Sequence, residues 1–154
     1  MTIRLGETQT TFKAPAHLMD PSRTVFAWFT DPPGIFIQFA RRAAFSLPLA
    51  QWVAGPMCTA LSKRYPAPEP IVLILDLTLM DGRDPQVRPI VVDASRAFAA
   101  RTRRTVVVPP QDASRVYLAS VSAACSLARL FGLVVSVESL SDAIRSLSQG
   151  SPDA

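Results

Sequence analysis

The sequence predicts an α/β fold in which a mixed β-sheet packs against helices. The first observation is the apolar, β-branched segment Ile71–Leu75, which is typical of a central strand buried on both faces. The second is that helical and strand-like patterns alternate after it, which favours parallel strands with right-handed crossovers. The third is a hairpin-like segment, Thr24–Arg41, ahead of it. We therefore expect an N-terminal antiparallel hairpin followed by a parallel β-α-β-α-β unit.

Length and composition indicate one folded domain. The chain has 154 residues, of which 49% are apolar and only 18% charged, so it can bury a sizeable core. We expect a single domain over residues 1–148 and a flexible tail over residues 149–154. The amino terminus lacks the apolar core of a signal peptide, and no segment reaches the about 18 uninterrupted apolar residues of a membrane span. A cytoplasmic location without a membrane span is expected.

The formal net charge of +4 comes largely from short basic clusters at Arg41–Arg42, Lys63–Arg64 and Arg101–Arg104. Cations at helix ends complement the helix dipole. No long basic stripe with interleaved aromatic residues is visible, so nucleic acid is not an expected partner. Cys58 and Cys125 lie in apolar, helix-like surroundings, which predicts reduced, buried thiols and no disulfide.

The first 41 residues are expected to form β-structure and loops. Thr8–Lys13 is rich in β-forming residues and predicts a short edge strand, and Ala14–Ser22 predicts a loop because it contains Pro15 and Pro21. Two β-branched and aromatic runs then predict a β-hairpin around a Pro-Gly turn. These runs are Thr24–Thr30 and Ile35–Arg41, and the turn is Asp31–Gly34.

A helix is expected from Ser46 to about Arg64, with Ser46 as its cap and Pro48 in its first turn. A Gly-Pro pair, residues 55 and 56, lies in the middle of this helix. Proline removes one backbone hydrogen bond and presses on the preceding turn, so we expect a kink or two shorter helices.

A second helix is expected after the central strand. Asp84 and Pro85 form a strong start signal, a capping carboxylate followed by proline, and an apolar stripe at helical spacing runs from Val87 to Phe98. Pro89 either costs one hydrogen bond in the second turn or moves the regular helix start a few residues later.

The C-terminal part of the chain predicts two further strands and two further helices. In order, these are a strand at Arg104–Pro109, a helix capped by Asp112 or Ser114 that ends at Gly132, a strand at Leu133–Val137, and a short helix to Leu147 that opens on the capping-box-like sequence Ser139–Asp142.

The segment Pro70–Pro85, which contains the predicted central strand and the turn after it, resembles the STAS-like superfamily, the fold of bacterial anti-sigma-factor antagonists and of related CRAL-TRIO-like small bacterial domains. The residues that carry the resemblance are Leu75–Thr78, then Gly82–Gln86 with the helix that follows. Antagonists of this kind place a phosphorylated serine at the helix start. Here Asp84 falls on the aspartate of that motif, but Pro85 and Gln86 fall on its serines, so the phosphorylation switch is absent. Phe131–Ile144 is similar to the closing strand and helix of the non-phosphorylated relatives.

The resemblance implies a non-catalytic regulatory or scaffolding module, active in signalling, that works through protein-protein contacts. The segment Asp81–Asp84 is expected to be exposed over a helix N-terminus and to bind a partner, although a cap and a turn alone would also explain it. Its own aspartates disfavour a bound phosphate. The expected partner-binding residues are Asp81, Gly82, Arg83, Asp84 and Arg88.

The residue types that enzymes use are scarce. His17 is the single histidine and lies in a proline-bordered loop without a nucleophile motif, and one histidine with two distant cysteines cannot form a zinc site. No Gly-rich nucleotide-binding loop is present. We therefore expect no cofactor and no metal. A carboxylate pair, Asp76 and Asp81, is the remaining enzymatic alternative, and it would need one carboxyl in an apolar pocket.

Aromatic residues concentrate in the hairpin and first helix, and core packing explains most of them. Both faces of Ile35–Phe39 are largely apolar, which indicates a surface for a protein partner or for a homodimer, with Trp28, Phe36 and Phe39 as candidates. The alternative function is a carrier that holds an apolar small molecule between helices and sheet, as CRAL-TRIO domains do.

Overall fold

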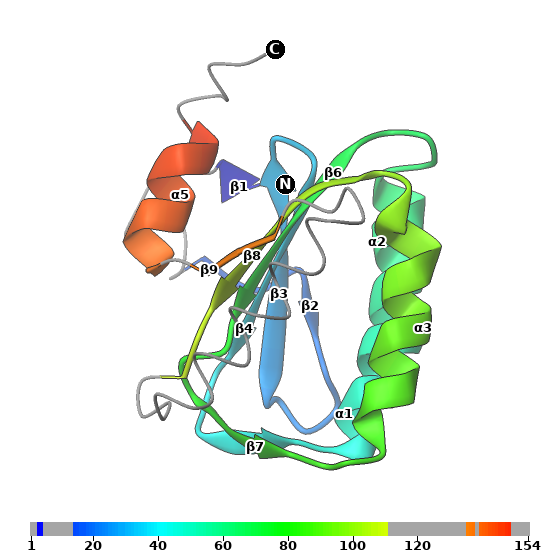
Figure 1. Cartoon of the computed structure of the whole chain (residues 1–154), viewed down its shortest axis with the longest axis vertical. Helices are drawn as coiled ribbons and strands as arrows, with labels where there is room; N and C mark the ends of the chain where they lie inside the picture. The colour runs from blue at the N-terminus through cyan, green and yellow to red at the C-terminus, as the bar shows by residue number, and fades with distance from the viewer. Residues whose placement is uncertain (1–2, 5–13, 111–134, 138, 149–154) are drawn as a thin grey trace.

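The structure of the chain is a computed structural model that describes residues 3–4, 14–110, 135–137 and 139–148. It has the predicted α/β architecture, with a mixed sheet between helices (Figure 1). Three sequence predictions lie outside the described residues: the edge strand at Thr8–Lys13, the helix between Asp112 and Gly132 that contains Cys125, and the tail from residue 149.

The main sheet has the strand order β1-β3-β4-β6-β8-β9, with β2 paired to β3. β3 and β4 are antiparallel, whereas β4, β6, β8 and β9 run parallel to one another. The predicted hairpin and the predicted parallel strands are thereby confirmed. The strands are β1 Ile3–Arg4, β2 Leu18–Met19, β3 Val25–Asp31, β4 Gly34–Phe39, β6 Ile71–Asp76, β8 Thr102–Val108 and β9 Val135–Val137.

Helices cover both faces of this sheet (Figure 1). The predicted first helix is one helical run in which the predicted kink is a π-helical segment that contains Pro56. This run and α3 lie together on one face, and α5 lies on the other. The bounds are α1 Leu47–Trp52, η2 Val53–Met57, α2 Cys58–Arg64, α3 Val87–Ala99 and α5 Leu140–Ser148.

Side-chain alternation divides the core into two layers. On β4, Ile35, Ile37 and Phe39 face α1, η2, α2 and α3, and their neighbour Phe36 faces the α5 side. Phe36 packs there with Trp28 at a ring-centroid distance of 5.5 Å. Both faces of the central strands are thus apolar because both are covered.

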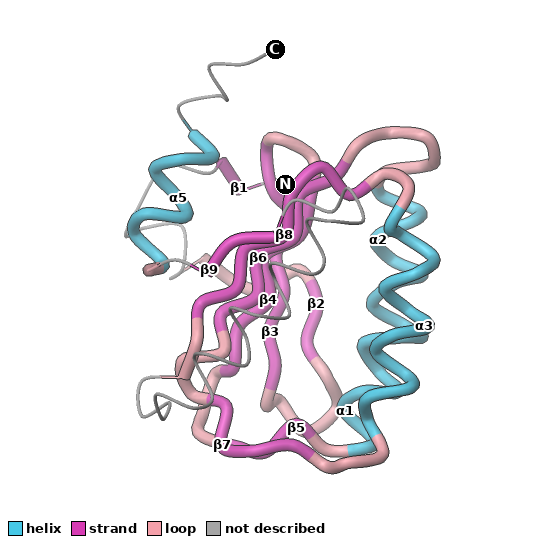
Figure 2. The backbone as a smooth tube through the Cα atoms, in the orientation of Figure 1, coloured by secondary structure: helices cyan, strands magenta, loops and turns pink. Residues whose placement is uncertain are grey.

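Four short strands were not predicted, and the first is β1, which pairs with β3. β2 lies in the segment expected to be a loop, and it pairs with β3. β5 Ala43–Phe45 and β7 Met80–Arg83 form a separate two-stranded parallel sheet at one end of the main sheet (Figure 2). The segment Asp81–Asp84 is exposed as expected over most of its length, but it is not only a turn, because Asp81–Arg83 belong to β7 and are held by pairing with β5.

The helix starts differ in detail from the predictions. Ser46 stands at the cap position of α1, but its side chain makes no capping hydrogen bond. α3 begins at Val87 with Gln86 at its cap position, so Pro89 lies in the first turn, where its missing N–H is not needed. Before α5, Ser139 caps as predicted, because its Oγ accepts a hydrogen bond from Asp142 N at 3.2 Å.

None of the helices within the described ranges is both long enough and apolar enough to cross a membrane.

Candidate functional site

The segment Asp81–Asp84 is positioned by backbone pairing. Ala43 N donates to Leu79 O at 3.2 Å, and Asp84 N donates to Phe45 O at 3.0 Å, so both ends of β7 are tied to β5. Asp81, Gly82 and Arg83 are exposed on this strand. Gly82 has a φ of +85°, a left-handed conformation that glycine adopts without steric cost.

Asp84 orders the turn between β7 and α3. Its Oδ1 accepts a hydrogen bond from Gln86 N at 2.9 Å, and its carbonyl oxygen accepts one from Val87 N at 3.1 Å. The predicted capping role therefore needs correction, since Asp84 acts two residues before the cap position of α3. The turn carries the chain from β7 directly into the helix.

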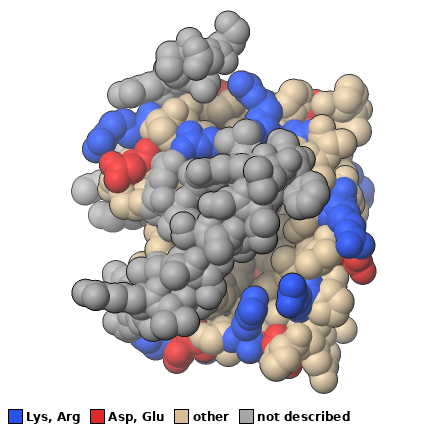
Figure 3. Space-filling view, in the orientation of Figure 1, with Lys and Arg blue, Asp and Glu red and all other residues tan. Residues whose placement is uncertain are grey.

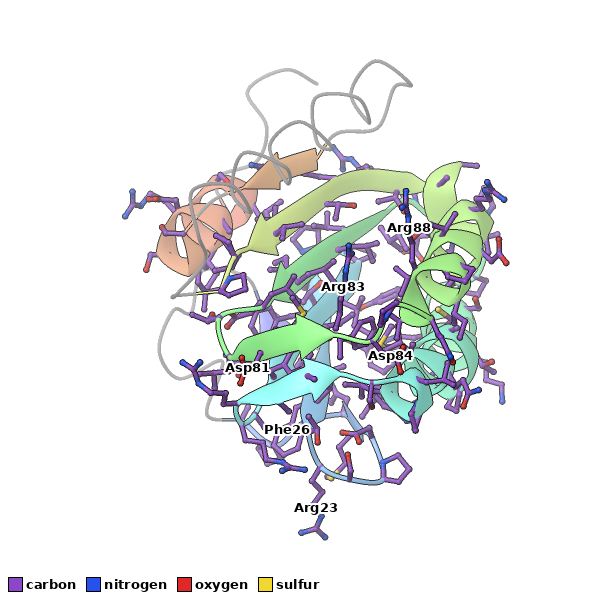
Figure 4. The ribbon with its side chains drawn as sticks, turned by 60° about the horizontal axis from the view of Figure 1, so that its bottom comes forward. Arg23, Phe26, Asp81, Arg83, Asp84 and Arg88 are labelled. Carbon is purple, nitrogen blue, oxygen red and sulfur yellow. The ribbon has the colours of Figure 1, made fainter. Side chains whose placement is uncertain are left out.

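The structure brings two of the five predicted partner-binding residues to one place. Arg83 ends β7 and Arg88 lies in the first turn of α3, and in Figure 4 both side chains extend in the same direction from these elements. Both are exposed, and both line the same cavity. Asp81, Gly82 and Asp84 do not line it.

This cavity has a volume of about 400 Å³ and lies between one face of the sheet, the β5–β7 pair, η2 and α3. Its walls are almost entirely hydrocarbon. The lining residues are Val25, Ile37, Phe39, Phe45, Val53, Leu75, Leu77, Met80, Arg83, Val87, Arg88, Val91 and Val92.

The two arginines are the charged residues of this lining. Within the part of the chain that the structure describes, neither has an ion pair or a hydrogen bond from its side chain. Val92, another residue of the lining, is 38% exposed, so the cavity opens to solvent beside α3. We call this opening, with Arg83, Arg88 and Val92, the rim of the cavity. The site combines an apolar interior with a cationic rim.

The carboxylate pair considered for catalysis is not assembled. Asp76 is 4% exposed and accepts hydrogen bonds from Gln38 Nε2 at 2.8 Å, from Thr78 N at 3.1 Å and from Thr78 Oγ1. Asp81 is exposed on β7. Neither carboxylate lines the cavity, so an acid and a base do not converge there.

His17 has a structural role. Its Nδ1 accepts a hydrogen bond from Phe29 N at 2.9 Å, and its ring stacks on Phe29 at a centroid distance of 5.5 Å. Burial lowers the pKa of His17, and the positive charge of Arg64 acts in the same direction. The imidazole is thus kept neutral, as its acceptor role requires.

The proposed dimer surface is contradicted by burial within the chain. Trp28, Phe36 and Phe39 are 2%, 1% and 4% exposed. Trp28 and Phe36 belong to the core layer on the α5 side, and Phe39 belongs to the layer on the opposite face. Their rings are used to pack helices on the sheet and are not available to a second chain.

The apolar residues that line the cavity were not predicted as site residues from the sequence. The apolar alternation of Leu75, Leu77 and Leu79 past the end of the predicted strand was the available signal. It continues the apolar face of β6 beyond the sheet and toward β7. No cluster of three or more histidine, cysteine, aspartate or glutamate side chains suited to a metal ion occurs among the described residues.

The strand order, the crossovers and the helix layers define a STAS-like fold. A solved structure with this fold is that of an uncharacterized protein of the DUF3478 family from Shewanella loihica PV-4, whose fold is described as SpoIIAA-like. The superposition has a TM-score of 0.60 and covers 87% of this chain and 98% of that chain, at 14% sequence identity. This likeness shows the shared fold. No protein-family model and no curated protein matches the sequence.

Proposed function

We propose that the chain is a non-catalytic STAS-like binding module that holds an apolar small molecule between its sheet and α3. The observation that carries the proposal is the cavity of about 400 Å³ lined by apolar side chains. Protein interiors are packed as densely as organic crystals, and few voids in them exceed one water molecule. This space differs in that it opens to solvent and its hydrocarbon walls are left for a bound apolar molecule to cover.

The dimensions of the cavity suit a small ligand. Pockets for small molecules have volumes of about 300–1,000 Å³ and mostly apolar walls, with a few polar groups that fix orientation. Here the walls come from β3, β4 and β6 and from α3, and Arg83 and Arg88 are the groups able to orient a ligand. A rigid sheet on one side and a helix on the other provide a preformed site.

A regulatory role through protein contacts is the second candidate, and one feature of β7 favours it. Among the described residues β7 pairs with β5 alone, so its other edge can accept an extended segment of a partner. The exposed residues Asp81, Gly82 and Arg83 lie on this strand. Because Arg83 also lines the cavity, ligand occupancy and partner contact would be coupled at one residue.

The test of the carrier function is native mass spectrometry of the chain purified by gentle lysis, followed by binding of an apolar fluorescent probe after extraction of lipids. We expect a stoichiometric small-molecule adduct, and stoichiometric probe binding once it is removed. Val91→Phe places a ring into the cavity from α3 and takes up space that the probe would occupy. Each buried methylene group contributes about 0.8 kcal/mol, so excluding two or more of them should weaken probe binding at least about tenfold.

Ala99→Phe is the matched control, since Ala99 is exposed at the end of the same helix and does not line the cavity. It should bind the probe as the wild type does. Equal binding by wild type and Val91→Phe, with both folded, would contradict the proposal, and so would a wild type that binds no apolar probe.

A further inference from the structure

The rim of the cavity is chemically unlike its interior. The interior is hydrocarbon from strands, η2 and α3, and the rim contains guanidinium groups from β7 and from the first turn of α3 (Figure 4). The two arginines come from different elements and reach the same opening. An anionic group at this opening would lie beside both cations.

We propose that the ligand is a single-chain amphiphile with an anionic headgroup, of which an alkyl carboxylate is the simplest form. This inference rests on the proposed function, because it assigns the tail to the apolar cavity. The headgroup is bound by Arg83 and Arg88 at the rim, and the hydrocarbon stems of these arginines continue the apolar wall.

Arginine suits this task for geometric reasons. Its planar guanidinium donates two parallel hydrogen bonds to a carboxylate, and it is charged at every physiological pH. Arg88 also lies at the N-terminus of α3, a helix of 13 residues, where the helix dipole adds positive potential. The two arginines and the dipole of α3 therefore both favour a negatively charged ligand group at the opening of the cavity.

Acidic residues near the rim do not cancel this preference. Asp81 and Asp84 belong to the same segment, but neither lines the cavity, and the Asp84 carboxylate accepts a hydrogen bond from Gln86 N. Where Figure 3 shows described residues, the basic and acidic side chains lie in small separate groups. The charges that line the cavity itself are both positive.

The experiment compares decanoate, 1-decanol and decyltrimethylammonium as probes for the lipid-extracted full chain by titration calorimetry. We expect decanoate to bind at least about tenfold more tightly than decanol, because its carboxylate can accept charge-assisted hydrogen bonds from the arginines. The preference should not be much larger, because both arginines are exposed and their charges are screened by solvent. The cation should bind most weakly. Shortening decanoate to octanoate should cost about fourfold for each methylene removed.

The double variant Arg83→Gln/Arg88→Gln should lose the preference for decanoate and keep its affinity for decanol. The matched control is Arg96→Gln, also on α3, whose side chain is 77% exposed and pairs with Asp93 at 3.5 Å. This control should retain the preference. Salt should weaken decanoate binding in the wild type and not in the double variant.

The outcomes separate the two proposals. Equal affinity of the wild type for decanoate and decanol, or tighter binding of the cation, would overturn the headgroup inference and leave the carrier function standing. Loss of decanol binding in the double variant would also overturn it, because the arginines would then act through packing. Failure of all three probes to bind would contradict the proposed carrier function itself.

Discussion

Asp20 uses both carboxylate oxygens to hold the turn that leads into β3. Its Oδ1 accepts hydrogen bonds from Thr24 N at 2.6 Å and Val25 N at 2.7 Å, and its Oδ2 accepts them from Ser22 N at 2.9 Å and Ser22 Oγ. Burial by itself raises the pKa of Asp20, but these hydrogen bonds outweigh it, and the pKa is lowered. The ionised form is therefore the one that the fold stabilises.

Asp20→Asn should destabilise the chain at neutral pH by about 1–3 kcal/mol, because the amide replaces an acceptor with a donor facing backbone N–H groups. Since the folded-state pKa lies below the ordinary one, the stabilisation by Asp20 is fully present above the ordinary value and is lost as the pH falls through the folded value. Urea unfolding at pH 7 and below about pH 4 measures this difference.

The wild type and Asp20→Asn should differ less in stability at the acidic pH than at pH 7. Asp93→Asn is the control, because the Asp93 side chain is 75% exposed and its ion pair with Arg96 lies on the surface of α3. It should change stability little at either pH. A deficit of Asp20→Asn that is the same at both pH values would contradict the role given to its charge.

At the same scale, the sequence allowed only part of the site to be predicted. Arg83 and Arg88 were selected because they surround a strand-to-helix turn, which is where ligands meet parallel sheets. Their joint role at a cavity depends on the direction of their side chains, which the sequence does not specify. Trp28 and Phe36 were misassigned to a surface because alternation cannot distinguish a sheet face covered by α5 from one left open.

At the scale of elements, two glycines with different surroundings provide a matched test. At Gly34, which opens β4, an added Cβ would lie 2.2 Å from Val72 O and 2.9 Å from Thr30 Oγ1. At Gly55, within the π-helical segment, an added Cβ would meet nothing within 4 Å. The close approach of β4 and β6 at Gly34 therefore leaves no room for a side chain.

Gly34→Ala should lower the free energy of unfolding by about 1–3 kcal/mol, as overpacking against backbone does. Gly55→Ala should leave it unchanged or raise it by up to about 1 kcal/mol, because alanine is the better helix former. Denaturant titration of the two variants compares these effects directly. Equal effects of the two substitutions would contradict the close approach of Gly34 to Val72.

Elements with a strong local pattern were predicted from the sequence, and elements defined by pairing were not. Ile71–Leu75 and the stripe of α3 have the apolar periodicity of a buried strand and an amphipathic helix. β5 and β7 have no such pattern, since they are only three and four residues long and exist because each pairs with the other. The sequence Asp81–Gly82 is typical of a turn, and it is part of a strand because of its tertiary pairing with β5.

At the scale of the whole molecule, the STAS-like fold follows from the order of its elements, and the cavity does not. Its walls combine segments far apart in the chain, among them Val25 on β3, Phe45 on β5, Leu75 on β6 and Val91 on α3. Each of these residues alone is an ordinary apolar residue that is buried or partly buried. The space between them is what remains after the helices pack on the sheet, and a sequence pattern does not report it.

The measurement that tests the central claim most directly is an NMR titration of the lipid-extracted chain with decanoate, in which methyl resonances are followed on both faces of the sheet. We predict that the methyl signals of Ile37, Leu75 and Val91, which line the cavity, shift and saturate at one ligand per chain. Those of Ile74 and Val106, in the core layer on the α5 side, should stay in place. No shift at the cavity methyls, or a response confined to the α5 side, would contradict the claim that this chain carries its ligand between the sheet and α3.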